Sequence, residues 1–427
     1  MAESTIREVI GRRLWDSRGR PTVEVEIRLG SGAAGRALAP AGASKGAGEA
    51  VDLRDGGSRF GGYDVTMAVA AVNGEIAARL RGLDAFDQQA ADDALIALDG
   101  TPNKGRLGGN ALIAASMAVA HAAAAAAGVP LWQHLSENKQ ARLPMPEIQI
   151  FGGGAHAGRR VDVQDFMIIP VGAADYTEAL DWCAEVYRSA GTLMAEAGLL
   201  QGVADEGGFW PAFQTNEEAL DMLVRSIERA GFRPGEQIAI SLDIAASEFG
   251  HAGRYRLNLE KRDLESGAMT ELLLGWLRRY PIVAIEDPLA EDDEEGFTRF
   301  TKTAGRVAVV GDDLLVTSAD RIRRAAARGA CNTVLIKPNQ AGTLSETKAA
   351  FDAAMAAGWA AIVSARSGET EDVTIVHLAV GWGAPILKVG SFTRSERLAK
   401  WNEGLRIAEA SGGRGALPPK EAFPWNR

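Results

Sequence analysis

The sequence predicts an α/β protein in which a small N-terminal α+β domain is followed by a larger (β/α)8-type barrel. Two observations lead to this fold. After the polar stretch SENKQARLPMP, short apolar segments alternate with amphipathic helical segments, which is typical of parallel strands joined by crossover helices. The chain also has 427 residues, more than one hydrophobic core usually supports. We expect the two domains to span residues 1–136 and 137–427.

The N-terminal domain is expected to begin with an antiparallel sheet and to continue as helices. Residues 22–29, TVEVEIRL, alternate apolar and polar side chains as a half-buried strand does. Residues 30–35, GSGAAG, match the GxGxxG spacing of dinucleotide-binding loops. The following residues contain Pro40 and form a poor helix, so we interpret the glycines as a hairpin loop. From about residue 49 to residue 135 the apolar pattern is helical.

The second domain contains enough apolar runs to close a barrel. With weaker candidates at residues 148–151 and 200–205, we expect about eight or nine strands in roughly 290 residues, and barrels of this type usually have about 250 residues. The stronger runs are VQDFMIIPVG, IAISLDIA, IVAIEDPL, VAVVGDDL, TVLIKPNQ, AAIVSARS and PILKVGS.

Composition excludes several classes of protein. The formal net charge of −10 argues against binding to the phosphate backbone of nucleic acids. Cys183 and Cys331 lie outside any CxxC pattern, which predicts neither disulfides nor a zinc site and fits a reducing cytosol. The first residues show no secretory signal. Ser116 and His121 interrupt the most apolar segment, so we expect a packed helix rather than a membrane span, and a cytoplasmic protein.

Most apolar runs of the second domain end on an ionisable residue. These residues are Asp243, Glu286, Asp287, Asp312, Asp313, Lys337, Arg366 and Lys388. The C-terminal ends of barrel strands converge on the mouth of the barrel, where active sites of this fold lie. Helix capping would explain a single carboxylate, but it does not account for the lysines and the arginine. Glu206 in VADEGGF and Asp165 in VQDFM join this group.

These charges suggest a metal-assisted reaction of an anionic substrate. Three carboxylates, Asp243, Glu286 and Asp312, follow consecutive apolar runs and suit a hard cation such as Mg²⁺, which prefers oxygen ligands. Two lysines and an arginine facing them would hold an anionic substrate against that metal. Because a partly desolvated lysine among other cations has a lowered pKa, we expect Lys337 to act as a general base.

Longer motifs identify the chain as similar to the enolase family over essentially its full length. The motifs are DSRGRPTVEVE, GASKGAGEA, DLRDG, AVAAVNGEIA, ADEGG, LDIAASEF, IEDPLAEDD, GDDLLVT, LIKPNQAGTL, RSGETED and SFTRSERLAKWNE. The resemblance implies an enolase-like barrel capped by the N-terminal domain, a mobile lid loop and a homodimer. Lysine or histidine bases with one or two Mg²⁺ are established for this superfamily, and we expect two Mg²⁺ in each active site.

The resemblance also implies a role for each matching residue. Lys337 would take the proton α to the substrate carboxylate, and Glu206 would be the acid that helps the β-hydroxyl leave. Asp165 would assist this departure, and His156 would act from another active-site loop. The substrate-binding residues would be Lys388, Arg366, Ser367, Ser44 and Lys45. The metal ligands would be Asp243, Glu286, Asp312 and, from the lid loop, Ser44.

The chain departs from the enolase pattern in its active-site loops. The replacements are Ala41 and Lys45 for a serine and a threonine of the lid, Gly152 for asparagine, Asp165 for glutamate, Ala204 for glycine and Ala365 for histidine. Because they change groups around the leaving hydroxyl and the lid, we expect a paralogue that keeps enolate formation and alters the substrate. Space at Ala365 and Gly152, with the added cation of Lys45, would suit a larger or more anionic substrate.

Several functions remain open at this point. The main expectation is an enzyme that forms an enolpyruvate from a small phosphorylated or phosphonylated carboxylate, like carboxyphosphonoenolpyruvate synthase of phosphonate and antibiotic biosynthesis. The alternative is a glycolytic enolase, which converts 2-phosphoglycerate to phosphoenolpyruvate and water. The racemases and cycloisomerases of the superfamily use a KxK pair, which this sequence lacks. A non-catalytic scaffold would be expected to lose Lys337 or the metal ligands, and all are present.

Overall fold

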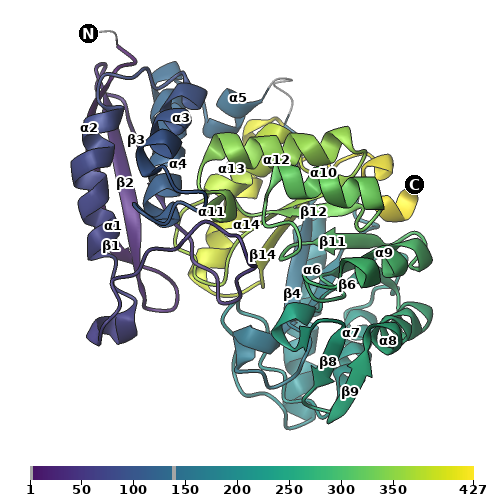
Figure 1. Cartoon of the computed structure of the whole chain (residues 1–427). Helices are drawn as coiled ribbons and strands as arrows, with labels where there is room; N and C mark the ends of the chain where they lie inside the picture. The colour runs from purple at the N-terminus through teal and green to yellow at the C-terminus, as the bar shows by residue number, and fades with distance from the viewer. Residues whose placement is uncertain (1–2, 137–140) are drawn as a thin grey trace.

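The computed structural model describes residues 3–136 and 141–427, and Figure 1 shows their two parts packed side by side. The N-terminal part starts with an antiparallel sheet in the order β1-β2-β3. Its strands are β1 (Ile6–Trp15), β2 (Pro21–Leu29) and β3 (Ala34–Leu38). The glycine-rich segment at residues 30–35 joins β2 to β3, so it is the predicted hairpin. The helices are α1 (Thr66–Ala71), α2 (Ala77–Leu80), α3 (Gln88–Asp99), α4 (Gly109–Ala127) and α5 (Leu131–Leu135).

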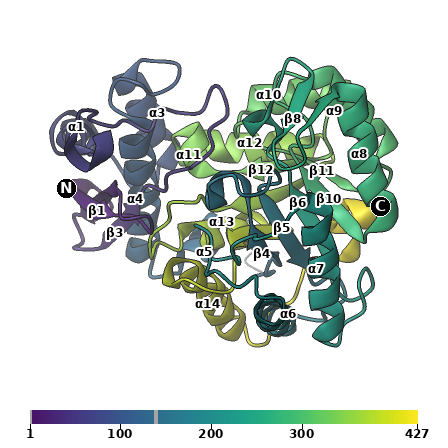
Figure 2. The same cartoon turned by 90° about the horizontal axis from the view of Figure 1, so that it is seen from below.

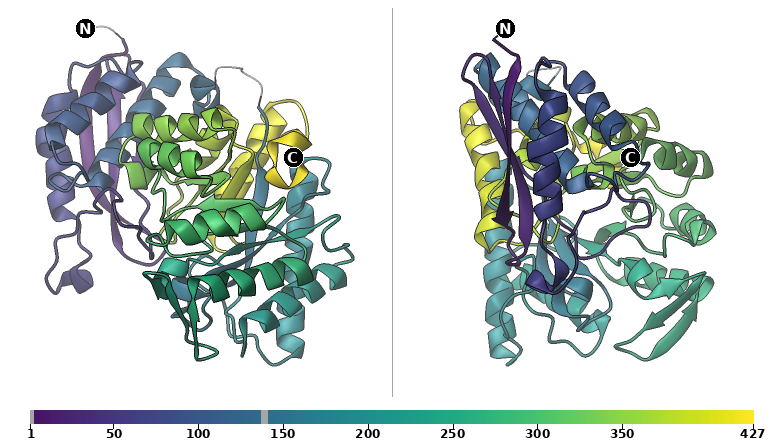
Figure 3. Two further views of the ribbon diagram at one scale, coloured as in Figure 1. Left: turned by 45° about the vertical axis from the view of Figure 1, so that its right-hand side comes forward. Right: turned by 60° about the vertical axis from the view of Figure 1, so that its left-hand side comes forward.

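Helix α4 forms the centre of the N-terminal core and packs against β2 and β3, beside the sheet that Figure 3 shows nearly edge-on. Gly35 allows this close approach, because a methyl group there would lie 2.1 Å from the backbone nitrogen of Ala122. By length and composition, α4 is the one helix among the described residues that could cross a membrane, and 78% of its apolar window is buried inside the protein. This burial agrees with the packed helix that the sequence predicts.

The second part is a closed barrel of eight strands, and this confirms the predicted fold class (Figure 2). Around the barrel the strand order is β10-β11-β12-β13-β14-β4-β5-β6. The strands are β4 (Met145–Gly152), β5 (Asp165–Ile169), β6 (Ala239–Asp243), β10 (Ile282–Glu286), β11 (Ala308–Gly311), β12 (Thr333–Ile336), β13 (Ala360–Ser364) and β14 (Ile386–Gly390). Helices cover their outer faces, which explains why most of these strands are almost entirely apolar.

Crossover helices and one small sheet complete the second part. The helices are α6 (Tyr176–Glu196), α7 (Asn216–Arg229), α8 (Ser266–Arg279), α9 (Glu294–Thr303), α10 (Ala319–Arg328), α11 (Pro338–Ala341), α12 (Leu344–Ala356), α13 (Thr374–Trp382) and α14 (Ser395–Ala410). The small antiparallel sheet contains β7 (Gly250–His251), β8 (Arg254–Leu257) and β9 (Arg262–Glu265).

Strand β5 departs from the predicted all-parallel barrel, because it pairs antiparallel with both β4 and β6. Asp165 is its first residue, yet the reversed direction brings this side chain to the same mouth as the C-terminal ends of the other strands. Ile169, the last residue of β5, joins an apolar cluster with Met145 and Phe423 that fills the opposite end of the barrel. The polar site is therefore confined to one end.

Three further expectations concern two weak strand candidates and the domain boundary. The weak strand candidate at residues 148–151 is part of β4. The candidate at residues 200–205 is wrong, because this described segment forms only an isolated bridge from Val203 to Phe209. The domain boundary predicted between residues 136 and 137 falls at residues 137–140, which lie outside the described residues, and it stays a prediction.

A glycine substitution tests the contact between β3 and α4. Gly35→Ala is expected to lower the free energy of unfolding by about 1–3 kcal/mol, because the methyl group would push β3 away from α4. The matched control is Gly275→Ala within α8, where the added methyl would come no nearer than 3.8 Å to Arg278. This control should raise the free energy of unfolding by about 0.5–1 kcal/mol. Equal effects in urea-induced unfolding would contradict the packing described above.

Candidate active site

The charged strand ends converge at the mouth of the barrel. Asp243 and Glu286 are the last residues of β6 and β10, and Lys388 lies within β14. Asp312 and Lys337 directly follow β11 and β12. All of these side chains are buried. The pairing of neighbouring strands therefore brings together, in one buried pocket, the charges that the sequence separates by many residues.

Lys388 lies at the centre of this pocket. Its Nζ is 2.9 Å from Oδ2 of Asp243, 2.7 Å from Oε2 of Glu286 and 3.4 Å from Oδ2 of Asp165. Burial lowers the pKa of Lys388, but the carboxylates of Asp243 and Glu286 outweigh burial and hold the pKa well above its usual value. The carboxylates therefore favour the charged form of Lys388, which is suited to holding an anion.

Lys337 differs from the prediction in its protonation. Its Nζ donates a hydrogen bond to Oδ2 of Asp312, and its backbone nitrogen donates to Oγ1 of Thr317. Burial lowers the pKa of Lys337, but the adjacent Asp312 carboxylate more than offsets this and raises the pKa above its usual value. The predicted lowering was wrong for this arrangement, because the nearest charge is an anion rather than another lysine.

The donor set at the strand ends fits a hard divalent cation. Asp243, Glu286 and Asp312 offer oxygen atoms, which are the ligands that Mg²⁺ prefers. Oε1 of Glu286 is buried without a hydrogen-bond partner among the described residues. Burial and the negative charge of Asp243 raise the pKa of Glu286 well above its usual value. Additional positive charge at this carboxylate would therefore be favourable.

A more compact acidic group lies next to the expected ligands. Oxygens of Asp287, Asp312 and Asp313 all lie within 4.8 Å of one another. Asp287, however, accepts the backbone N–H of Asp312 at 2.9 Å and that of Asp313 at 2.8 Å. Both of its oxygens thus hold the turn after β11, and we interpret Asp287 as a structural residue rather than a metal ligand.

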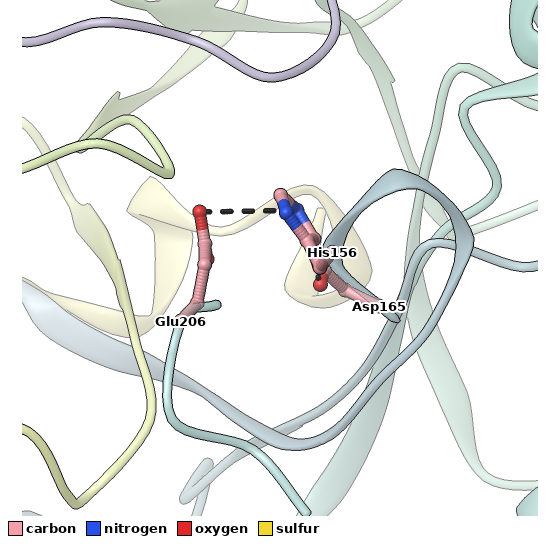
Figure 4. Close-up of side chains that lie close together, drawn as sticks. All are labelled: His156, Asp165 and Glu206. Carbon is pink, nitrogen blue, oxygen red and sulfur yellow. Dashed lines mark ion pairs between the residues drawn. The ribbon is translucent and has the colours of Figure 1, made fainter. Parts of the chain in front are cut away.

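Three predicted residues form a second cluster at the mouth (Figure 4). Nε2 of His156 lies 3.7 Å from Oδ1 of Asp165 and 3.8 Å from Oε1 of Glu206. Burial raises the pKa of Asp165. Burial also acts to raise the pKa of Glu206, but His156 and nearby cations outweigh it and lower this pKa. Two neighbouring carboxyl groups with opposite shifts are typical of a proton-transfer pair.

The lid loop, residues 41–45, covers these clusters. Ala41 and Gly368 exchange two backbone hydrogen bonds, and the backbone nitrogen of Ala43 donates to Oγ of Ser367 at 2.7 Å. The cavity between the loop and the strand ends measures about 20 Å³, whereas sites for small molecules usually measure about 300 Å³ or more. Its lining includes Gly42, Ala43, Ser44, His156, Gln164, Asp165, Glu206, Asp243, Lys337, Ser364, Ala365, Arg366, Ser367 and Lys388. In this arrangement the cavity is too small for a substrate, which agrees with the expected mobility of the loop.

Arg366 connects the lid to the barrel. Its guanidinium donates to the backbone oxygen of Ser44 at 2.9 Å, to Oε2 of Glu49 at 3.0 Å and to Oδ1 of Asn339 at 3.1 Å. The side chains of Arg366 and Glu49 are only 3% and 7% exposed. In this closed state, the predicted phosphate-binding arginine is engaged by the lid itself.

Two expectations about the loops are corrected by the structure. Lys45 does not line the cavity, since its side chain is 50% exposed and its Nζ lies 3.6 Å from Oδ2 of Asp52. Gly152 does not open space, because a methyl group at this position would lie 2.7 Å from Cβ of Ala204. Ala365 does line the cavity, as expected.

Several buried polar residues at the site were not predicted from the sequence. Gln164 donates to Oδ2 of Asp243 at 3.1 Å, and Gln149 donates to Asp165. Glu147 accepts a hydrogen bond from Ser241 inside the barrel. Glu147 and Gln149 interrupt the apolar run of β4, and a polar residue inside such a run is the signal that could have identified them. Glu49 carries no such local signal, because its partner Arg366 is 317 positions away.

Removing the charge of Glu49 tests the attachment of the lid. Glu49→Gln is expected to lower stability by about 3–5 kcal/mol, because it leaves the buried Arg366 without its anion. Amide hydrogen exchange at residues 42–46 should accelerate. The matched control is Glu291→Gln, since Glu291 accepts the backbone N–H of Ala47 at 3.0 Å and has no described contact with Arg366. If amide exchange at residues 42–46 accelerates in Glu291→Gln but not in Glu49→Gln, Glu49 is not the residue that attaches the lid.

Comparisons with known proteins agree with this architecture. The family model described as "Enolase, C-terminal TIM barrel domain" matches residues 140–422, and that described as "Enolase, N-terminal domain" matches residues 6–135. A curated protein named "Enolase" from Rubrobacter xylanophilus is 49% identical over 417 residues, which cover 97% of this chain and 97% of that protein. The chain therefore belongs to the enolase family and is an enolase-type lyase.

Proposed function

We propose that the chain catalyses the dehydration of 2-phosphoglycerate to phosphoenolpyruvate. The main support is the buried set of strand-end carboxylates and lysines, which suits the removal of a proton next to a carboxylate. The similarity to a protein named "Enolase" along almost the whole of both chains supports this reaction over one with a changed substrate.

The metal requirement is part of this proposal. Asp243, Glu286 and Asp312 would hold one Mg²⁺, and Ser44 of the lid would contribute to a second. The ions, when bound, would supply positive charge to the substrate carboxylate, where negative charge increases as the α-proton leaves. The unpartnered Oε1 of Glu286 supports this assignment.

Two lysines would have separate roles in the first half of the reaction, the removal of the α-proton. Lys388 remains charged among its carboxylates and would orient the substrate carboxylate. Lys337 would take the proton from the α-carbon. Only the neutral amine can accept that proton, so the contact of Lys337 with Asp312 must weaken before the transfer.

The cluster of His156, Asp165 and Glu206 would serve the second half. As the bond from the β-carbon to its hydroxyl breaks, the carboxyl pair would deliver a proton and the hydroxyl would leave as water. The opposite pKa shifts of Asp165 and Glu206 support a pair that holds a single proton. Arg366 and Ser367 would hold the phosphate once the lid releases them.

The main expectation from the sequence, a paralogue like carboxyphosphonoenolpyruvate synthase, is not supported. The comparisons favour enolase, which was the alternative. That expectation gave the loop replacements too much weight, because it counted each one as an independent loss of a functional group. Ala204 fills the space beside Gly152, so these two replacements compensate for each other. Ala365, which lines the cavity, is a replacement that still favours a different substrate.

The cellular state of the protein is also a proposal. The family resemblance suggests a homodimer in the cytoplasm. Cys183 and Cys331 are both buried and free of disulfides, which is compatible with a reducing compartment.

The reaction can be tested with 2-phosphoglycerate and Mg²⁺ by following the ultraviolet absorbance of phosphoenolpyruvate. Lys337→Ala is expected to lower the rate roughly 10²- to 10⁴-fold, because a positioned base contributes about this much. Chelation of divalent cations should abolish turnover, and added Mg²⁺ should restore it. In heavy water, deuterium should enter at the α-carbon only with Lys337 intact. Exchange without dehydration in the unmodified protein would refute the proposed reaction and indicate a changed second step.

A further inference from the structure

Gln149 is a completely buried amide within β4 that contacts Asp165 of the proposed proton-transfer pair and the backbone of Gly208, two residues after Glu206. Its Oε1 accepts the backbone N–H of Gly208 at 2.8 Å. Its Nε2 donates to Oδ1 of Asp165. Because a backbone N–H can only donate, Oε1 must face Gly208 and Nε2 must face Asp165. The orientation of the amide is therefore fixed by the fold.

The space around this amide is created by small residues. A methyl group on Gly152 would lie 3.1 Å from Oε1 and 3.2 Å from Nε2 of Gln149. A methyl group on Gly208 would lie only 2.5 Å from the same Oε1. Any larger side chain at either glycine would displace the amide. The site therefore accommodates Gln149 at the expense of side chains at positions 152 and 208.

The turn that carries Glu206 is fastened to the same amide. The backbone nitrogen of Ala204 donates to the oxygen of Gly208 at 2.7 Å, and that of Gly207 donates to the oxygen of Ala204 at 3.0 Å. Glu206 lies inside this closed turn. By holding Gly208 with one end and Asp165 with the other, Gln149 fixes the position of one carboxyl group relative to the other.

We propose that Gln149 is a positioning residue whose length matches the short side chain of Asp165. Aspartate at position 165 is one methylene shorter than the glutamate of the enolase pattern, and Gln149 supplies the contact that holds it. A glutamate at position 165 would project into the space of the amide and His156. This inference rests on the proposed function, because it assigns Asp165 to the departure of the hydroxyl.

An exchange of lengths tests the proposal in the full-length protein. Gln149→Asn shortens the amide side chain by one methylene, and Asp165→Glu lengthens the carboxylate side chain by one methylene. Each single variant is expected to lower the dehydration rate roughly 10- to 100-fold, as loss of a supporting contact in a site typically does. Each should still exchange the α-proton of 2-phosphoglycerate in heavy water, because Lys337 is untouched. The double variant should recover most of the dehydration rate.

A matched control separates positioning from general stability. Asn332 is an amide that joins the backbone of β11 to the start of β12, at the end of the barrel away from the site. Asn332→Ser should lower the melting temperature without changing the ratio of α-proton exchange to dehydration. If this control changes the ratio as strongly as Gln149→Asn, the positioning role is overturned.

The double variant decides the outcome. If the fold-decrease in its dehydration rate equals the product of the two single fold-decreases, the residues act independently and the proposal is overturned. If the unmodified protein does not dehydrate 2-phosphoglycerate, the proposed function fails separately. In that case the melting temperatures of the unmodified protein, the two single variants and the double variant test the length match. A decrease in the double variant smaller than the sum of the two single decreases supports it, and an additive decrease overturns it.

Discussion

The mouth of the barrel depends on ammonium groups enclosed by carboxylates. Lys388 lies within 3.4 Å of acidic side chains from β5, β6 and β10, and Lys337 is paired with Asp312. Charges can be buried in this way only when they face one another, because an unpaired buried charge is strongly destabilising. A slip of one residue in any of these strands would turn its charged end towards the packed helices and leave the partners unpaired. The same charge pairs therefore fix both the register of the barrel strands and the geometry of the site.

Much of the fold could be predicted from the sequence, because apolar runs and their charged ends are local patterns. The direction of β5 could not, since an apolar run has the same appearance in both directions and only its connections fix its direction. The pKa shift of Lys337 was missed because it depends on which neighbour lies nearest, and that neighbour, Asp312, comes from another strand. The outward position of Lys45 depends on the path of a loop, for which sequence spacing gives no rule.

The replacements in the active-site loops show why residues read one at a time can mislead. Gly152, Ala204 and Asp165 appear in the sequence as separate losses of functional groups. In space, the methyl group of Ala204 and the amide of Gln149 occupy the volume beside Gly152, and the same amide contacts Asp165. Tightly packed interiors couple changes of size in neighbouring side chains. The replacements therefore belong to one group of side chains that pack together. Their number says little about how far the function has changed.

The closure of the barrel has a consequence for synthesis on the ribosome. Strand β4 pairs with β14, and Phe423 from the end of the chain seals the lumen opposite the site. The N-terminal sheet is complete by residue 38, so its strand pairs can form while the rest of the chain is still being made. The barrel, in contrast, remains an open sheet until β14 at residues 386–390 has emerged, and β4 exposes an unpaired edge during that time. A nascent chain that has not yet made β14 therefore carries an edge that could pair with another chain.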